Sequence, residues 1–145
     1  MQIVRVFDAL PEGFDALKAD AVAEGVRNMT LLADEWVSGA ERFDGPDEGL
    51  FAVFIEGDLA GVGGVTVETG AGEPAMRMRR LYVRPAYRRM GLGRVLAGAM
   101  MQQGFAAAPL LTANARATPA ASMFWEVMGF EAADRPGFTH RLRAG

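Results

Sequence analysis

The sequence predicts one mixed α+β domain of 145 residues, in which helices flank a central twisted sheet. Short runs of β-branched and apolar residues, bounded by Gly, Pro or Asp, are typical of strands. Longer segments in which apolar residues recur every three or four positions are typical of amphipathic helices. A chain of this length can bury about two-thirds of its unfolded surface, so no second domain is needed to form a core.

The first third of the chain predicts a strand followed by two helices. Residues 2–7 alternate between apolar and polar side chains, as a half-buried strand does. Apolar residues then recur at helical spacing from 14 to 37. Gly25 indicates a break, Asn28 is expected to cap the second helix, and Gly39 to end it.

Two β-rich runs in the middle of the chain predict an antiparallel hairpin. Residues 50–55 and 59–67 are joined by only three residues, which suits a tight turn. Gly61, Gly63 and Gly64 interrupt the second run. Glycines inside a strand indicate a bulge or a close backbone approach, and we favour a structural explanation for these three.

The second half predicts a strand at 76–83, a helix beginning near Leu92 and a buried strand at 109–114. Thr118 is a suitable cap for a last helix that ends at Gly129, and two short strands would close the sheet. The residues expected on the inward face of the helix near Leu92 are Leu92, Val95, Leu96, Ala99 and Gln103.

The composition excludes several classes of protein. The chain has no cysteine and only His140 as a histidine, which argues against a metal site or a Ser-His-Asp triad. A net charge of −3 and a pI near 5.2 argue against nucleic-acid binding. No apolar run is long enough for a membrane span or typical of a signal peptide, so we expect a cytoplasmic protein without membrane partners.

The segment 79–94 is the most informative part of the sequence. Seven arginines lie between 77 and 94, although the chain as a whole is acidic. Gly91 and Gly93 stand where the predicted strand passes through a loop into a helix, so backbone N–H groups and the helix dipole are available to an anion. The pattern indicates a phosphate-binding loop, and it lacks the lysine of a P-loop and the third glycine of a dinucleotide fingerprint.

The spacing Arg88-x-x-Gly91-x-Gly93 after Leu81-x-Val83-x-Pro85 resembles the acetyl-CoA-binding motif of the GCN5-related N-acetyltransferase (GNAT) superfamily. The resemblance implies the acyl-CoA N-acyltransferase fold, with a mostly antiparallel sheet. It also implies that Leu81, Tyr82 and Val83 meet the pantetheine arm of the coenzyme. The residues that would surround the pyrophosphate are Arg88, Arg89, Met90, Gly91, Leu92, Gly93 and Arg94.

A second motif, the stretch 124–130 (FWEVMGF), is similar to the terminal-helix signature of the same family. The order of predicted elements also matches, so the resemblance extends over nearly the whole chain. It implies four further coenzyme contacts, from Asn114, Ser122, Phe124 and Trp125.

The implied reaction is transfer of an acetyl group from acetyl-CoA by direct attack of a primary amine on the thioester. Trp125 stands where many members have a tyrosine that protonates the thiolate, and an indole is no proton source. Tyr82 or water would replace it as the proton donor, or the thiolate would leave without assistance. The sequence leaves the catalytic residues unknown, and the candidate bases are Glu35, Glu68, Glu73 and His140.

The acceptor is expected between the first two helices and the sheet, which points to Arg27 and Trp36. Arg77 stands where many members have a glutamate, and an arginine there is consistent either with an acceptor that carries an acidic group or with a surface salt bridge. The expected partners are a small-molecule or peptide amine and a second copy of the chain. One alternative is a non-catalytic acyl-CoA-binding module. A transferase acting on charged tRNA is a third class, disfavoured by the acidic residues at 8–48.

Overall fold

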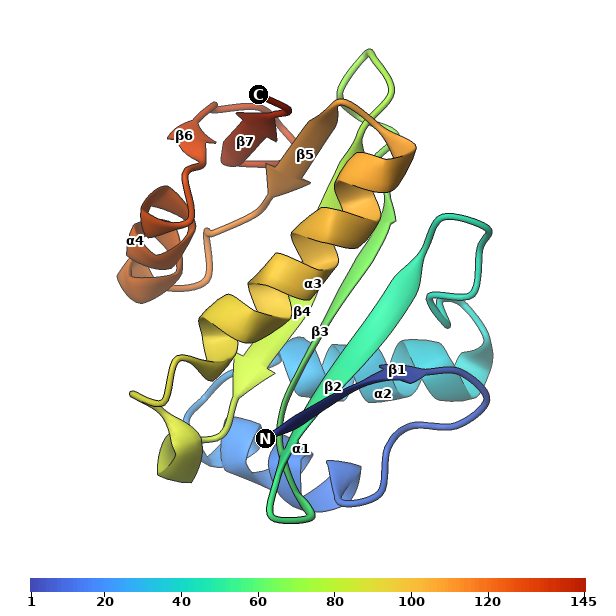
Figure 1. The fold of residues 1–145 in the computed structure, drawn as a ribbon, viewed down its shortest axis with the longest axis vertical. Helices are drawn as coiled ribbons and strands as arrows, with labels where there is room; N and C mark the ends of the chain where they lie inside the picture. Colours follow the sequence, from blue (N-terminus) through green and yellow to red (C-terminus); the bar gives the residue numbers. More distant parts are fainter.

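The computed structural model describes residues 1–145 as a seven-stranded sheet with helices on both faces, as Figure 1 shows. The strands are β1 (Gln2–Val6), β2 (Gly49–Ile55), β3 (Asp58–Val67), β4 (Met76–Val83), β5 (Leu110–Ala113), β6 (Glu131–Ala132) and β7 (His140–Arg143). The helices are α1 (Phe14–Ala23), α2 (Asn28–Ser38), α3 (Leu92–Ala107) and α4 (Pro119–Val127), with a 3₁₀ turn at Pro85–Tyr87. The mixed fold and the mostly antiparallel sheet are confirmed.

The strand order is β1-β2-β3-β4-β5-β7-β6. All neighbours are antiparallel except β4 and β5, which run parallel and pair only through Met76–Met78 and Leu111–Ala113. The predicted hairpin is present as β2 and β3. Because β4 continues for five residues beyond its pairing with β5, its second half has a free edge.

Two apolar cores form, one on each face of the sheet. Leu96 and Met100 of α3 pack with Met76 and Met78 of β4 on one face. Leu17 and Leu32, from α1 and α2, belong to the core on the other face. Figure 1 shows α3 crossing in front of the sheet and α1 and α2 behind it. No helix is long and apolar enough to cross a membrane.

The strand glycines have structural roles, as expected. A Cβ at Gly63 would lie 2.7 Å from the sulfur of Met100, and one at Gly64 would lie 2.5 Å from the ring of Phe43. The two faces of β3 therefore carry no side chain where α3 and the 41–49 loop press against the sheet.

Two local predictions need correction. Asn28 does not cap α2: it is the first residue of the helix, and its Nδ2 donates a hydrogen bond to the Leu81 carbonyl over 3.1 Å. The inward face of α3 is also rotated from the prediction, because small residues allow α3 to approach the sheet closely. Its buried residues are Leu92, Leu96, Ala97, Met100 and Gly104, whereas Val95, Ala99 and Gln103 are not buried.

Candidate coenzyme and acceptor site

A β-bulge in β4 marks the centre of the site. Gly64 pairs with Arg79 and Val62 with Tyr82, so a single residue of β3, Gly63, stands opposite both Arg80 and Leu81. Arg80 has a φ of 55°, in the left-handed region. An extra residue of this kind reverses the side-chain alternation beyond it and strengthens the local twist. The bulge therefore turns the end of β4 away from β5.

The free edge of β4 offers backbone groups beyond the bulge. Arg84 N–H bonds the Ala60 carbonyl of β3, and alternation along an antiparallel strand then directs the N–H and C=O of Leu81 and Val83 away from β3. Side chains bond both of these carbonyls: Asn28 donates to Leu81, and Arg88 Nε donates to Val83 over 3.1 Å. The two N–H groups remain to bind a ligand that lies along the strand.

A cavity of about 510 Å³ occupies the opening between β4 and β5. Its walls come from both faces of the sheet. Arg27 and Asn28 at the start of α2 line it from one side, and Ala121 and Trp125 of α4 from the other. Elements from both faces of the sheet therefore border one cavity.

The arginine loop, residues 84–91, leads from the end of β4 to the N-terminus of α3. Gly91 precedes the helix with a φ of 77°, and no side chain caps the first turn. The first intrahelical bond is donated by Val95 N–H, so the N–H groups of the three preceding residues are free. Arg89 and Arg94 are exposed and form no ion pair or side-chain hydrogen bond. This end of α3 has the chemistry of a phosphate site.

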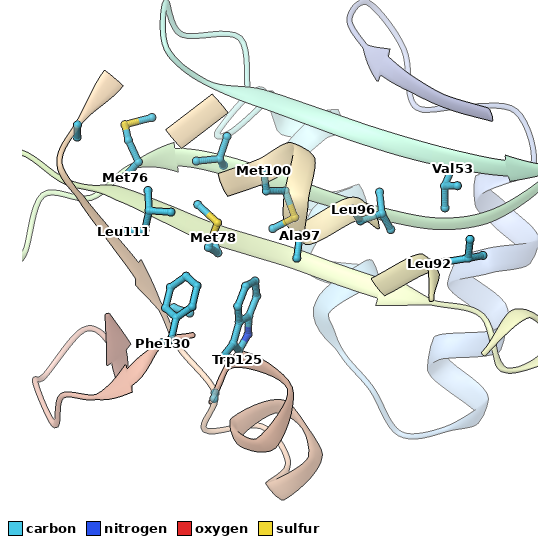
Figure 2. Packing of buried hydrophobic residues seen from close by; sticks show 14 of the residues in the cluster. Val53, Met76, Met78, Leu92, Leu96, Ala97, Met100, Leu111, Trp125 and Phe130 are labelled. Carbon is cyan, nitrogen blue, oxygen red and sulfur yellow. The ribbon is translucent and has the colours of Figure 1, made fainter. Parts of the chain in front are cut away.

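Helix α4 places aromatic side chains beside this loop. A Cβ at Gly93 would lie 3.2 Å from the ring of Phe124, so the glycine allows α3 and α4 to meet closely. Trp125 contacts Phe124 and Phe130 edge to face, each with ring centroids 5.0 Å apart. Figure 2 shows Trp125 and Phe130 directed toward Met78 of β4. Thr118 caps α4 by accepting a hydrogen bond from Ala121 N–H, as predicted.

The remaining predicted coenzyme residues lie in different surroundings. Asn114 is exposed and lines the cavity. Ser122 contacts Glu126 and His140, over 2.9 and 3.3 Å, and does not line the cavity. Arg88 is already engaged, because both of its terminal nitrogens bond the Glu24 carboxylate over 2.6 Å.

Comparison with known proteins decides the family. The model of the acetyltransferase (GNAT) family matches residues 14–130. This chain belongs to the GNAT family. A search of curated proteins finds no match.

Solved structures agree with the GNAT fold. A proposed acetyltransferase from Exiguobacterium sp. 255-15 superposes with a TM-score of 0.86 and 23% identity, over 98% of this chain and 92% of that one. The toxin AtaT bound to the C-terminus of the antitoxin AtaR and to acetyl-CoA superposes with a TM-score of 0.70 and 13% identity, over 98% of this chain and 92% of that one. A chain of the AtaT–AtaR complex bound to DNA superposes with a TM-score of 0.70 and 13% identity, over 99% of this chain and 94% of that one.

The prediction of partners is wrong. It admitted only a small-molecule or peptide amine acceptor, or a second copy of the chain, and excluded nucleic acid on the basis of net charge. Chains of this GNAT fold are found in complexes with an antitoxin and with DNA. An acidic net charge describes the average surface, and it does not exclude a protein or nucleic-acid partner at one part of it.

The residues predicted for the acceptor separate into two groups. Arg27 and Arg77 line the cavity. Trp36 is 6% exposed and packs in the core under α1 and α2, so its position does not fit a substrate contact.

The proposed acid and bases are mostly distant from the opening. Tyr82 packs in the core on the α1 and α2 face, and its hydroxyl bonds Glu24, so it does not reach the cavity. Burial and the Glu24 hydrogen bond raise the pKa of Tyr82, which further disfavours proton donation. Among the four candidate bases, only Glu35 contacts residues that line the cavity: it bonds Arg80 over 2.8 Å and pairs with Arg79 over 3.5 Å.

The other three candidate bases are held elsewhere. Glu68 is buried and accepts from Thr112 over 2.8 Å, and Glu73 pairs with Arg143 over 2.8 Å. His140 is 4% exposed and bonds Glu126 over 3.0 Å.

Sequence reasoning missed the bulge and the contact from Asn28. The bulge did leave a signal, because Met76 to Arg79 alternate apolar and basic residues and a second arginine, Arg80, breaks that alternation. Two polar residues in succession, after a stretch that alternates, are expected where a bulge inserts one extra residue into a strand. The bond from Asn28 to Leu81 has no signal of this kind, because it joins segments 53 residues apart.

Proposed function

We propose that this GNAT chain is an acetyl-CoA-dependent N-acetyltransferase in which a primary amine attacks the thioester directly. The observation that carries the proposal is the cavity between β4 and β5, which α2 and α4 line from opposite faces of the sheet and Leu81 lines from the free edge of β4. The geometry allows coenzyme on the α3 and α4 face and acceptor on the α1 and α2 face.

The residues present fit the coenzyme. The free N–H groups at the start of α3, together with Arg89 and Arg94, would hold the pyrophosphate. The N–H of Val83 would bind a pantetheine amide, and Leu81, Trp125 and Asn114 would border the thioester end of the pantetheine arm. Arg88 would keep its pair with Glu24 and fix the loop against α1.

Acetyl-CoA would supply an activated acyl group, and the chain would contribute position and polarisation. A strand N–H at the bulge, directed into the cavity, is suited to stabilise negative charge on the thioester oxygen. Holding the amine and the thioester in one opening removes much of the entropic cost of their encounter. Formation of the C–N bond would break the C–S bond, and CoA would leave as a thiolate that takes a proton from solvent. No acidic side chain lines the cavity, so the amine proton would pass through water to Glu35, which pairs with Arg80 at the cavity wall.

Thermal unfolding with acetyl-CoA, free CoA and NAD tests the coenzyme site. A ligand at a hundredfold its Kd stabilises by about 2.7 kcal/mol, which raises the Tm by several degrees. Both CoA species should stabilise the protein and NAD should not. Replacing Arg89 and Arg94 by Ala should weaken the effect, whereas Arg135→Ala, at an exposed loop position between β6 and β7, should leave it intact. No shift with either CoA species would contradict the proposal.

Release of free thiol with a panel of primary amines tests the chemistry. The alternative, an acyl-CoA-binding module without activity, is favoured by the replacement of the usual tyrosine and glutamate by Trp125 and Arg77. Stabilisation by acetyl-CoA with no amine-dependent thiol release across the panel would support that alternative and overturn catalysis.

A further inference from the structure

The acceptor wall of the cavity carries four positive charges, of which the protein pairs only two with carboxylates. Its charged lining residues are all arginines: Arg27, Arg77, Arg79 and Arg80. Arg79 and Arg80 are compensated, because both pair with Glu35 and Arg79 also lies 3.8 Å from Glu41. Arg27 and Arg77 form no ion pair, and no carboxylate lines the cavity.

Arg77 is the more informative of the two. Its Nε is fully buried and has no hydrogen-bond partner. A buried donor without a partner costs about 1–3 kcal/mol, more when it is charged, so a ligand group that accepts from this nitrogen would recover that free energy. The flanking residues in the sheet, Thr66 and Thr112, are neutral, and Thr112 together with Gly70 N–H engages the nearby Glu68.

Two further observations indicate a positive electrostatic potential in the cavity. The N-terminus of α2 opens at the cavity beside Arg27, with no side chain capping it, so its free N–H groups and dipole favour an anion. Burial, followed by repulsion from Arg80 and Arg77, lowers the pKa of Arg79, as expected where guanidinium groups are crowded.

The coenzyme does not account for this charge. The pyrophosphate site proposed above consists of Arg89, Arg94 and the start of α3, beyond the far end of β4. Arg77 is six residues before Val83, which is roughly 20 Å along an extended strand. The pantetheine arm that would pass between them is uncharged.

We propose that the acceptor is a primary amine that also carries an oxyanion, a carboxylate or a phosphate, which Arg77 binds and Arg27 assists. A guanidinium with a free Nε and terminal nitrogen can bind such a group through two parallel hydrogen bonds. The amine would then extend along β4 toward the bulge. This inference deepens the proposed function and rests on it.

Paired amine probes test the inference by binding, without requiring turnover. Each pair would share one amine and chain length, such as 4-aminobutyrate with its uncharged amide, and 3-aminopropyl phosphate would distinguish phosphate from carboxylate. Calorimetry on protein saturated with free CoA would give the Kd of each probe. We expect at least one oxyanion class to bind roughly ten- to a hundredfold more tightly than the matched amide.

Variants at Arg77 connect that preference to the residue. Arg77→Met should abolish the preference for the charged probe over its amide. It should not lower the Tm, because the substitution removes an unpaired buried donor and keeps an apolar stem. Arg77→Lys keeps the positive charge but loses the two parallel donors of the guanidinium, so it should retain part of that preference. Arg135→Ala is the matched arginine control and should leave it unchanged.

Equal affinity for charged and neutral probes, or absence of binding by both, would overturn the inference. So would a preference that survives in Arg77→Met. Failure of the proposed function is seen separately, as absence of stabilisation by acetyl-CoA, because that measurement does not involve the acceptor.

Discussion

Glu24 connects the end of α1 to the arginine loop through one carboxylate. It accepts two hydrogen bonds from Arg88 and one from the hydroxyl of Tyr82, whose ring also lies 5.7 Å from the Arg88 guanidinium. Charge-assisted pairs of this geometry are stronger than neutral hydrogen bonds. The same residues therefore hold α1, β4 and the loop before α3 in a fixed relation.

The Glu24 cluster predicts a pH dependence of stability. The Arg88 hydrogen bond, helped by Tyr82, holds the pKa of Glu24 below its ordinary value of 4.5. A carboxyl whose pKa is depressed by folding contributes stability above the unfolded-state pKa, and this contribution is lost as pH falls through the folded-state pKa. We expect the urea midpoint to fall between about pH 5 and pH 3, and Glu24→Gln to reduce that fall.

The control for Glu24 is Glu12→Gln, an exposed carboxylate before α1 that forms no ion pair. It should leave the acid side of the profile unchanged. If both variants reduce the fall equally, the Arg88 contact does not carry the effect.

At the scale of elements, α3 shows how small residues decide packing. Gly104 faces the sheet, where a Cβ would lie 2.6 Å from Leu111 Cδ2 and 3.4 Å from Met76 Cβ. Gly98 of the same helix is exposed, and a Cβ there would have no neighbouring atom within 4 Å. The two glycines therefore differ in whether the surrounding structure leaves room for a methyl group.

Substitution of these glycines should change stability in opposite directions. Gly104→Ala should destabilise, because overpacking costs typically about 1–3 kcal/mol against a helix-propensity gain of up to ~1 kcal/mol. Gly98→Ala, the matched variant, should stabilise by about 0.5–1 kcal/mol. Chemical denaturation measures both, and a stabilising Gly104→Ala would show that α3 moves away from the sheet at little cost.

At the scale of the molecule, the parallel pairing of β4 and β5 ends early and leaves a cavity that elements from both faces of the sheet line. The N–H groups of Leu81 and Val83 lie on the free edge of β4, whereas the N–H of Arg84, which follows the strand, donates to Ala60 over 2.8 Å. Protection from exchange should therefore differ between residues that are almost adjacent in sequence.

Hydrogen exchange resolved by residue tests the opening. Without ligand, the amides of Leu81 and Val83 should exchange faster than that of Arg84. Acetyl-CoA should slow both and leave Arg84 little changed, because the ligand would take up the free N–H groups of the strand edge. Equal protection of all three without ligand would mean that the opening is closed in solution.

Sequence reasoning reached most of the fold because its signals are local. The alternation in β1, the hairpin of β2 and β3, and the Thr118 cap with Pro119 in α4 each depend on a few adjacent residues. The buried face of α3 was less predictable. Gly104 lies on it because Leu111 and Met78 leave no room for a side chain at that position, and those residues belong to other elements.

The sequence by itself determined the order of elements and the arginine-rich loop that leads to the uncapped start of α3, because turn residues and periodicity act over short distances. Only the tertiary structure decided how charge is distributed at the site. It paired Arg88 with Glu24 and Arg80 with Glu35 and left Arg77 without a partner. Neutralisation of a charge depends on atoms within a few ångströms, and those atoms come from helices dozens of residues away in the chain.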